Sequence, residues 1–375
     1  MKSSVLKENL KEGLMVVERI ATKSLSLPVL NNILMTATKN TLELSATDLE
    51  IAVTYTILSK NEQEGLVVIP SKALSQFVGL LSDQSVDLET KEGTLLVKGK
   101  NQRANLKTIP ADDFPIIPPI QNPKFSITIP AQLLCEGISQ IAQLASPNQA
   151  RPEISGIFFS FSQKELRVVA TDSFRLGEKT LPLEKENGVD AHFILPQKGA
   201  REILNIFSEK TSSVEISLSA NQVLFDYHAP QNPSEPSIQI ISRLIEGEYP
   251  NYQDVIPSKY QTTIKAKKIE LLNQLKAASI FSNKIQEIHV VADPKKKAIE
   301  LSARSAEFGE NDSTLQASIE GKGGEASFNW RFLIDGLSHI KTSDVEFKMN
   351  GSDGPASLKG VQEEGYQYII MPLRV

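Results

Sequence analysis

The 375-residue chain contains the same pattern three times, and this repeat limits the possible folds more than any other feature. Each copy has an alternating strand, a polar turn and a second strand, at residues 33–51, 157–176 and 288–308. The first two copies are 124 residues apart. A repeat of this length indicates several similar domains in place of one large core.

Each repeat also contains two amphipathic stretches with apolar residues on one side at 3.6 residues per turn. These predicted helices cover residues 6–23, 71–81, 131–145, 197–208, 266–280 and 330–341. A helix of this kind buries one face against an antiparallel sheet, so each third of the chain is expected to be an α+β layer with two helices on one side. The proline-rich loops at 115–123 and 251–257 divide the chain into predicted domains 1–123, 124–252 and 253–375.

Three such layers in a line leave a sheet edge open at each end. Open edges favour aggregation unless they pair, and pairing with a second copy head to tail closes a ring. The repeat therefore suggests a homodimer.

The net charge of −5, from 40 basic and 45 acidic residues, argues against a nucleic-acid binder when taken alone. The six predicted helices, however, carry 12 basic and 7 acidic residues, so the rest of the chain holds the acidic excess. Helices that share one side would present positive charge to a phosphate backbone. The alternative, with equal weight, is that these charges are the ordinary solvated faces of amphipathic helices.

The sequence has no phosphate-binding glycine loop, no paired cysteines and no metal-spaced histidines, so we expect no catalysis, no cofactor and no metal. Asp48 and Asp172 occupy equivalent repeat positions, and we expect them to cap turns by accepting backbone N–H bonds. A hydrolase that uses Asp172 is the enzymatic alternative. The single cysteine, Cys135, lies in an apolar run and is expected to be a buried, inert thiol.

No apolar run approaches the roughly 20 residues that a membrane-spanning helix needs. The first ten residues, MKSSVLKENL, contain no apolar signal region. We therefore expect a cytoplasmic protein with no membrane partner.

Five sequence blocks in order resemble the bacterial sliding clamp, the beta subunit of DNA polymerase III. The blocks are LPVLNNIL at 27–34, LSATDLE at 44–50, ATDSFRL at 170–176, EGEYPNY at 246–252 and MPLRV at 371–375. The resemblance implies the DNA clamp fold, with three repeated domains, closed as a head-to-tail dimeric ring around duplex DNA. It implies a non-catalytic processivity factor that tethers the DNA polymerase III catalytic subunit and serves the clamp loader and other clamp-binding-motif proteins.

The resemblance also implies positions for DNA contacts, and helix geometry adds three more. The positions carried over from the family are Ser24, Lys72, Asn148 and Arg151. The additions are Lys23, Lys198 and Arg201. Pro152 and Glu153 stand where some relatives have aromatic residues, so base stacking is not expected there.

A pocket for client peptides and a dimer interface follow from the same resemblance. The pocket residues are Thr171, Phe174, Arg175, Leu176, Pro250, Val255, Met371, Pro372, Leu373 and Arg374. Phe174 replaces a common histidine, and Arg175 and Arg374 are expected at the rim, where they would meet an acidic residue or backbone carbonyls. The interface residues are Leu106, Ile280 and Phe281.

A rival hypothesis is a monomeric repeat scaffold that binds proteins without encircling DNA. The mass in solution separates the two, because the ring requires about twice the chain mass.

Overall fold

The computed structural model describes residues 1–21, 27–148, 150–183, 190–230 and 237–374. The chain forms two compact units, one of residues 1–135 and 201–244 and the other of residues 136–200 and 245–375. We call them unit 1 and unit 2. No helix in the described part of the chain is long and apolar enough to cross a membrane.

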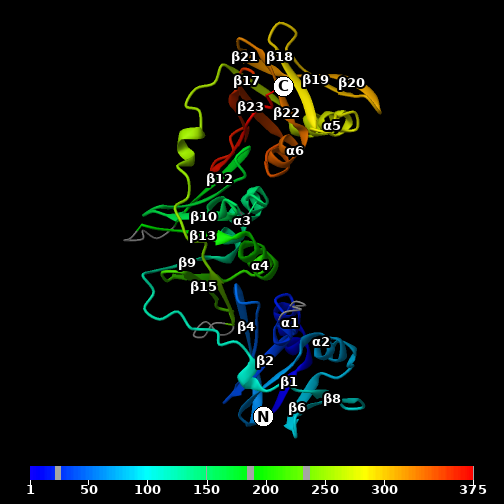
Figure 1. Cartoon of the computed structure of the whole chain (residues 1–375), viewed down its shortest axis with the longest axis vertical. Coiled ribbons are helices and arrows are strands. Elements are labelled where there is room, and N and C mark those ends of the chain that lie inside the picture. The colour runs from blue at the N-terminus through cyan, green and yellow to red at the C-terminus, as the bar shows by residue number, and fades with distance from the viewer. Residues whose placement is uncertain (22–26, 149, 184–189, 231–236, 375) are drawn as a thin grey trace. The chain divides into compact units, whose positions relative to one another are not determined.

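Six α-helices are described, and each falls inside one of the predicted windows (Figure 1). They are α1 (Lys7–Glu18), α2 (Ser71–Leu80), α3 (Ala131–Ile141), α4 (Gln197–Phe207), α5 (Lys268–Ser279) and α6 (Trp330–Ser338). Helix α1 ends five residues before its window does, although Ile20 beyond its end is buried. The apolar period continues into the following turn, so the period alone does not locate the helix end.

Unit 1 contains a 12-stranded antiparallel sheet in which β8-β7-β6-β1-β4-β16-β15-β14-β9 are neighbours and β2, β3 and β5 branch from β4 through β3. The strands are β1 (Lys2–Leu6), β2 (Asn32–Thr38), β3 (Thr41–Thr47), β4 (Ile51–Gln63), β5 (Gly65–Pro70), β6 (Ser85–Lys91), β7 (Thr94–Lys98), β8 (Arg103–Lys107), β9 (Phe125–Pro130), β14 (Ser213–Leu218), β15 (Gln222–Tyr227) and β16 (Ile238–Arg243). Strand β4 pairs with β16, which lies more than 170 residues further along the chain. The sheet therefore continues from the first repeat into the second.

Unit 2 contains a nine-stranded sheet, β13-β10-β11-β12-β25-β24-β23-β17-β21, and a four-stranded sheet, β20-β19-β18-β22. The nine strands are β10 (Gly156–Phe161), β11 (Glu165–Thr171), β12 (Arg175–Pro182), β13 (Ala191–Pro196), β17 (Thr262–Lys267), β21 (Ser318–Gly321), β23 (Asp344–Asn350), β24 (Gly354–Gly360) and β25 (Tyr366–Ile370). The four strands are β18 (Glu287–Asp293), β19 (Ala298–Ser305), β20 (Gly309–Gln316) and β22 (Gly324–Asn329). Strand β12 pairs with β25 in the same way as β4 pairs with β16.

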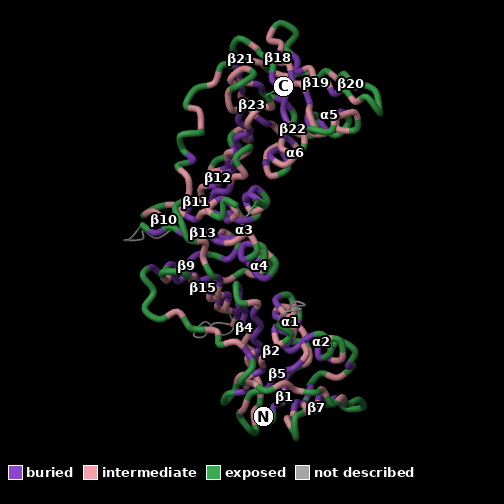
Figure 2. Tube along the Cα trace, viewed as in Figure 1, coloured by how far each residue is buried: buried purple, intermediate pink, exposed green. Residues whose placement is uncertain are grey.

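The first helices of the first two repeats pack closely on strands through glycines at matching positions. A Cβ atom on Gly13 of α1 would lie 2.9 Å from side-chain atoms of Leu44 and Tyr55. A Cβ atom on Gly137, 124 residues later, would lie 2.8 Å from Leu181. A larger residue at either position would force these neighbouring side chains to move, so glycine allows the helices to approach the strands closely. Figure 2 shows the resulting core, with buried residues along the strands and on the helix sides that face them.

An ion pair inside unit 2 leads to a stability prediction. The Lys179 ammonium is almost fully buried and lies 3.2 Å from Glu136, which also pairs with Lys341. The hydrogen bond from Lys341 is the main cause that lowers the pKa of Glu136. Glu136→Gln is expected to lower the free energy of unfolding by about 1–2 kcal/mol at pH 7, because it leaves the buried Lys179 ammonium without its carboxylate partner. The effect is no larger because the Glu136 side chain is partly exposed to solvent, which screens the pair.

The pH dependence of this difference has a defined sign. A carboxylate with a lowered folded-state pKa stabilises the fold above its unfolded pKa, and this contribution is lost as the pH falls through the folded value. Urea unfolding of the wild type and Glu136→Gln should therefore converge in acid, below about pH 4. A gap that persists there would show that Glu136 acts through packing and not through its charge.

Candidate functional site

Two turns with the same hydrogen bonds connect paired strands in the two units. In unit 2, the Asp172 carboxylate accepts bonds from the backbone N–H groups of Phe174 and Arg175 at 3.0 and 2.9 Å. The Thr171 hydroxyl donates to the Arg175 carbonyl at 2.7 Å and accepts from the Ser173 N–H group. Ser173 has a φ of 76°. The turn is therefore closed by its own side chains.

The matching turn in unit 1 repeats each of these contacts. Asp48 accepts from the N–H groups of Glu50 and Ile51, and Thr47 donates to the Ile51 carbonyl at 2.9 Å. Leu49 has a φ of 77°. The prediction that Asp48 and Asp172 cap turns is confirmed.

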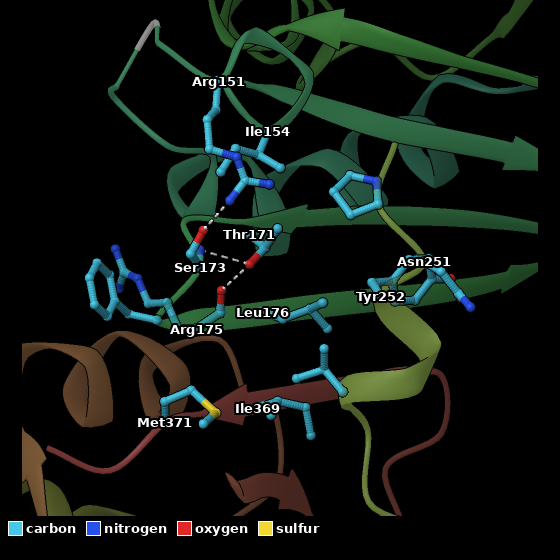
Figure 3. Close-up of a pocket in the computed structure, with 13 residues that line it drawn as sticks. Arg151, Ile154, Thr171, Ser173, Arg175, Leu176, Asn251, Tyr252, Ile369 and Met371 are labelled. Atoms are coloured by element: carbon cyan, nitrogen blue, oxygen red, sulfur yellow. Dashed lines mark hydrogen bonds between the residues drawn. The ribbon is translucent and has the colours of Figure 1, made fainter. Parts of the chain in front are cut away.

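A cavity of about 230 Å³ lies beside the unit 2 turn (Figure 3). Its walls come from the turn, from the segment around Tyr252 and from the end of β25. The lining residues are Arg151, Ile154, Thr171, Ser173, Phe174, Arg175, Leu176, Pro250, Asn251, Tyr252, Val255, Ile369 and Met371. We call this cavity the Phe174 pocket.

The floor of the Phe174 pocket is a packed apolar cluster. Val169, Leu176, Tyr252 and Ile369 are buried together. The Tyr252 hydroxyl donates to Glu178 at 2.6 Å, and burial together with this bond raises the pKa of Tyr252. The segment that carries Tyr252 is thus held on the sheet, and the pocket is formed before any ligand binds.

The rim of the pocket is apolar and accessible. Phe174 is 62% exposed and Val255 is 45% exposed, and both line the same cavity, so they form an apolar patch at its mouth. The N–H group of Met371 donates to the Phe174 carbonyl at 2.8 Å, so the start of the C-terminal segment is tied to the turn. Exposed apolar side chains above a preformed apolar floor suit a short peptide with apolar anchors.

Arg175 lines the pocket, but it already has charged partners within the chain. Its side chain is 11% exposed, and its guanidinium bonds to Asp172 at 3.0 Å and to Asp335 and lies 4.4 Å from the centre of the Phe332 ring. Burial opposes its charge, but Tyr368 and the two carboxylates outweigh this and raise the pKa of Arg175. A cation already paired with two carboxylates fixes the turn and is not free to meet an acidic ligand.

Seven of the ten predicted pocket residues line the cavity, and the last three do not. Thr171, Phe174, Arg175, Leu176, Pro250, Val255 and Met371 lie around it. Pro372, Leu373 and Arg374 are not among the lining residues, and the Leu373 N–H group instead donates to the Ser327 carbonyl on β22. Sequence reasoning missed Ile154, Ser173, Asn251, Tyr252 and Ile369. Ser173, Asn251 and Tyr252 lie inside the blocks 170–176 and 246–252, and Ile369 lies in the apolar strand directly before Met371, so these four had a usable signal, whereas Ile154 had none.

A second cavity of about 680 Å³ adjoins the Phe174 pocket and shares five lining residues with it, Arg151, Ile154, Ser173, Phe174 and Arg175. It is lined by two residues predicted to contact DNA, Asn148 and Arg151. Arg151 pairs with Glu153 at 3.1 Å and donates to the Ser173 hydroxyl at 3.2 Å. These contacts place Arg151 at the edge of the pocket.

The remaining predicted DNA contacts are exposed or lie outside the described residues. Lys72 on α2 and Lys198 and Arg201 on α4 are exposed. Lys23 and Ser24 lie outside the described residues. The observed helix bounds enclose eight basic and seven acidic residues, so most of the positive excess belongs to residues that flank the helices. Arg19, Lys267 and Lys341, all beyond helix ends, pair with Glu202, Asp344 and Glu136.

Cys135 is buried, and this burial raises the pKa of its thiol to about 11. Such a thiol is protonated at neutral pH and is a poor nucleophile, as predicted. No group of three or more His, Cys, Asp or Glu residues in the described segments could hold a metal ion.

Comparison with known proteins identifies the fold and the family. The three family models for the N-terminal, central and C-terminal domains of the DNA polymerase III beta subunit match residues 1–118, 128–251 and 253–374. The chain is 25% identical to a beta sliding clamp of Synechocystis sp., with all of both chains covered, and 28% identical to one of Staphylococcus epidermidis, with 93% of each covered. A crystal structure of the DNA polymerase sliding clamp from Bacillus subtilis matches with a TM-score of 0.93 and 25% identity, covering 100% of this chain and 99% of that one.

The three domains, each with helices on antiparallel sheets, define the α+β clamp fold. The chain belongs to the DNA polymerase III beta subunit family, the bacterial sliding clamps. It is a processivity factor, a non-catalytic subunit of a DNA polymerase.

Proposed function

We propose that two copies of this chain close head to tail into a ring around duplex DNA, and that the Phe174 pocket holds client proteins on that ring. The clients would be the DNA polymerase III catalytic subunit, the clamp loader and other proteins with a clamp-binding motif, acting in the bacterial cytoplasm. The domains of the ring would span residues 1–123, 124–252 and 253–375.

The observation that carries the tethering role is the Phe174 pocket itself. An apolar, preformed cavity with an exposed aromatic rim binds a flexible peptide without a large interface, so one site can serve many partners. The adjoining cavity extends the surface, and together they would accept an extended segment with two anchors.

Two sheet edges support the dimer. Among the described strands, β8 pairs only with β7 and β20 only with β19. Strand β8 exposes Arg103 and Lys107, whereas β20 exposes Glu310 and Asp312. Glu310 and Asp312 share one cation, Arg304 of β19, so the β20 edge keeps a net negative charge. Opposite charges on two unlike edges of one chain favour pairing between β8 of one copy and β20 of the next.

The other end of the four-stranded sheet is partly covered. Leu373 bonds to Ser327 of β22, so the C-terminal segment blocks this edge. Strand β20 is therefore the edge of that sheet that remains for a partner. Leu106 on β8 and Ile280 and Phe281 after α5 would supply the apolar part of the interface.

The DNA contacts of the ring would be weak and independent of sequence. Lys23, Ser24, Lys72, Asn148, Lys198 and Arg201 would reach the phosphate backbone, with Arg151 shared between the DNA side and the pocket. Contacts to phosphates carry no base information, and a closed ring needs no tight contact to stay on DNA.

Titration of a fluorescent client peptide that contains glutamine and a Leu-Phe anchor tests the tethering role. Removal of residues 371–375 is expected to abolish binding, because it deletes Met371 and the backbone bond to Phe174. Phe174→Lys should weaken binding at least tenfold, or about 1.4 kcal/mol, because it replaces the apolar rim.

A shorter truncation that removes only residues 372–375 is the matched control. It keeps Met371, so binding should remain within about threefold of the wild type. Equal affinity in the wild type and the 371–375 truncation would place client binding elsewhere on the chain.

A further inference from the structure

Unit 1 contains a cavity at the position that matches the Phe174 pocket in the repeat. It has a volume of about 180 Å³ and lies beside the turn that begins at Thr47. The lining residues are Thr47, Leu49, Glu50, Ile51, Ala52, Pro115, Ile116, Ile117, Pro118, Gln222, Ile241 and Arg243. As in unit 2, the walls come from a turn, from a proline-containing segment between repeats and from the end of a paired strand.

The backbone frames of the two cavities agree bond by bond. Ala52 pairs with Ile241 as Leu176 pairs with Ile369. The Arg243 N–H group donates to the Glu50 carbonyl at 2.9 Å, and the Met371 N–H group donates to the Phe174 carbonyl at 2.8 Å. Glu50 therefore occupies the place of Phe174, and Arg243 occupies the place of Met371.

The side chains differ, and so must the preferred ligand. Charged Glu50 and Arg243 replace the apolar rim, while apolar exposure moves to neighbouring positions. Leu49 is 43% exposed and Ile116 is 91% exposed. Two exposed aliphatic side chains at the mouth of a cavity favour an apolar anchor.

A larger cavity of about 590 Å³ adjoins this one and is lined by residues of β2, β3, β4, β5, β15 and β16 and of segment 111–120. The two share five lining residues, Ala52, Pro115, Ile116, Ile117 and Ile241. The larger cavity adds the acidic residues Glu43 and Asp112 and the exposed Leu66. Over both cavities three carboxylates face one guanidinium, so the charge favours a basic partner.

We infer that unit 1 carries a second peptide-binding groove, which takes an extended partner segment with an aliphatic or aromatic anchor flanked by Arg or Lys. The inference extends the peptide-binding role proposed for the Phe174 pocket to its repeat counterpart. One clamp would then hold two classes of client on each chain, distinguished by the charge beside the anchor.

The test uses three fluorescent ten-residue peptides that share a Leu-Phe anchor and carry two Arg, two Gln or two Glu residues beside it. The peptides are titrated against the full-length Phe174→Lys protein, in which the Phe174 pocket is weakened and contributes less to the measured binding. The Arg peptide should bind at least fivefold more tightly than the Glu peptide. Ile116→Ser and Leu49→Asn should each weaken Arg-peptide binding by about tenfold, and Glu50→Gln should reduce the preference for Arg.

Met15→Ser is the matched control, because Met15 is a comparably exposed apolar residue of unit 1 that lines neither cavity. Leu49→Asn keeps the fold, since asparagine tolerates a positive φ better than leucine does. The inference is overturned if Ile116→Ser and Leu49→Asn bind the Arg peptide as Met15→Ser does, if the Glu peptide binds equally well, or if no saturable binding occurs. All of these measurements are made in the Phe174→Lys protein. Failure of the unit 1 groove would therefore leave the separate test of the Phe174 pocket unaffected.

Discussion

Protein loaded on closed circular duplex DNA is expected to remain bound through a high-salt wash and to leave quickly once the circle is cut. In a ring, the link to DNA is topological, whereas each phosphate contact is weak and is screened by salt. The net charge of −5 and the paired cations at the helix ends make tight electrostatic binding a poor alternative explanation. Gel filtration of labelled protein on nicked circles, before and after cleavage by a single-cutting nuclease, measures the effect.

The control is the same plasmid linearised before loading, with its ends blocked by a bound protein. Blocked ends should restore retention, because a ring cannot slide past them. Equal loss from open and blocked linear DNA, or equal retention on circles and open linear DNA, would exclude encirclement and favour a scaffold that does not surround DNA.

The double substitution Ile280→Asp and Phe281→Asp is expected to convert the dimer into folded monomers. Ile280 is 65% exposed in the single chain, so an aspartate there costs the isolated fold little. Burial of two unpaired carboxylates against a partner would cost several kcal/mol, enough to raise the dimer dissociation constant at least a thousandfold. Sedimentation velocity at micromolar concentration distinguishes the two masses, with Met15→Asp as a control for an added surface charge.

A charge exchange tests the pairing of β8 with β20 more specifically. Arg103→Glu with Lys107→Glu should weaken the dimer, and so should Glu310→Lys with Asp312→Lys. All four changes together restore opposite charges on the two edges and should restore much of the association. A quadruple variant that associates no better than the worse double variant would show that these edges do not meet.

Five of the six described helices were predictable from a clear apolar period, whereas the period of α5 is weak and its position follows from the repeat. Pro70 and Pro196 directly precede α2 and α4, and the spacing of Leu10, Leu14 and Val17 gives the buried side of α1. The helix ends were less predictable. Apolar residues beyond the last turn, such as Ile20 and Ile340, are buried and continue the same period.

The pocket was predictable in part, because its apolar rim residues lie in blocks that resemble a known family. The ion pair between Arg175 and Asp335 could not be predicted, because Asp335 lies on α6, 160 residues away in the sequence. The charge of the helices was also misjudged. Three of the cations that made them look basic, Arg19, Lys267 and Lys341, lie just beyond the helix ends and pair with carboxylates on other elements.

The two Thr-Asp turns have a consequence for how such a chain can diversify. Each turn is closed by hydrogen bonds from its own threonine and aspartate, so its shape does not depend on the side chain at the second position of its tip. Glu50 in one copy and Phe174 in the other can therefore change at little cost to folding, whereas the positive φ of Leu49 and Ser173 restricts the residues allowed there. After an ancestral duplication, selection could alter the specificity of one copy while the other kept its original partners.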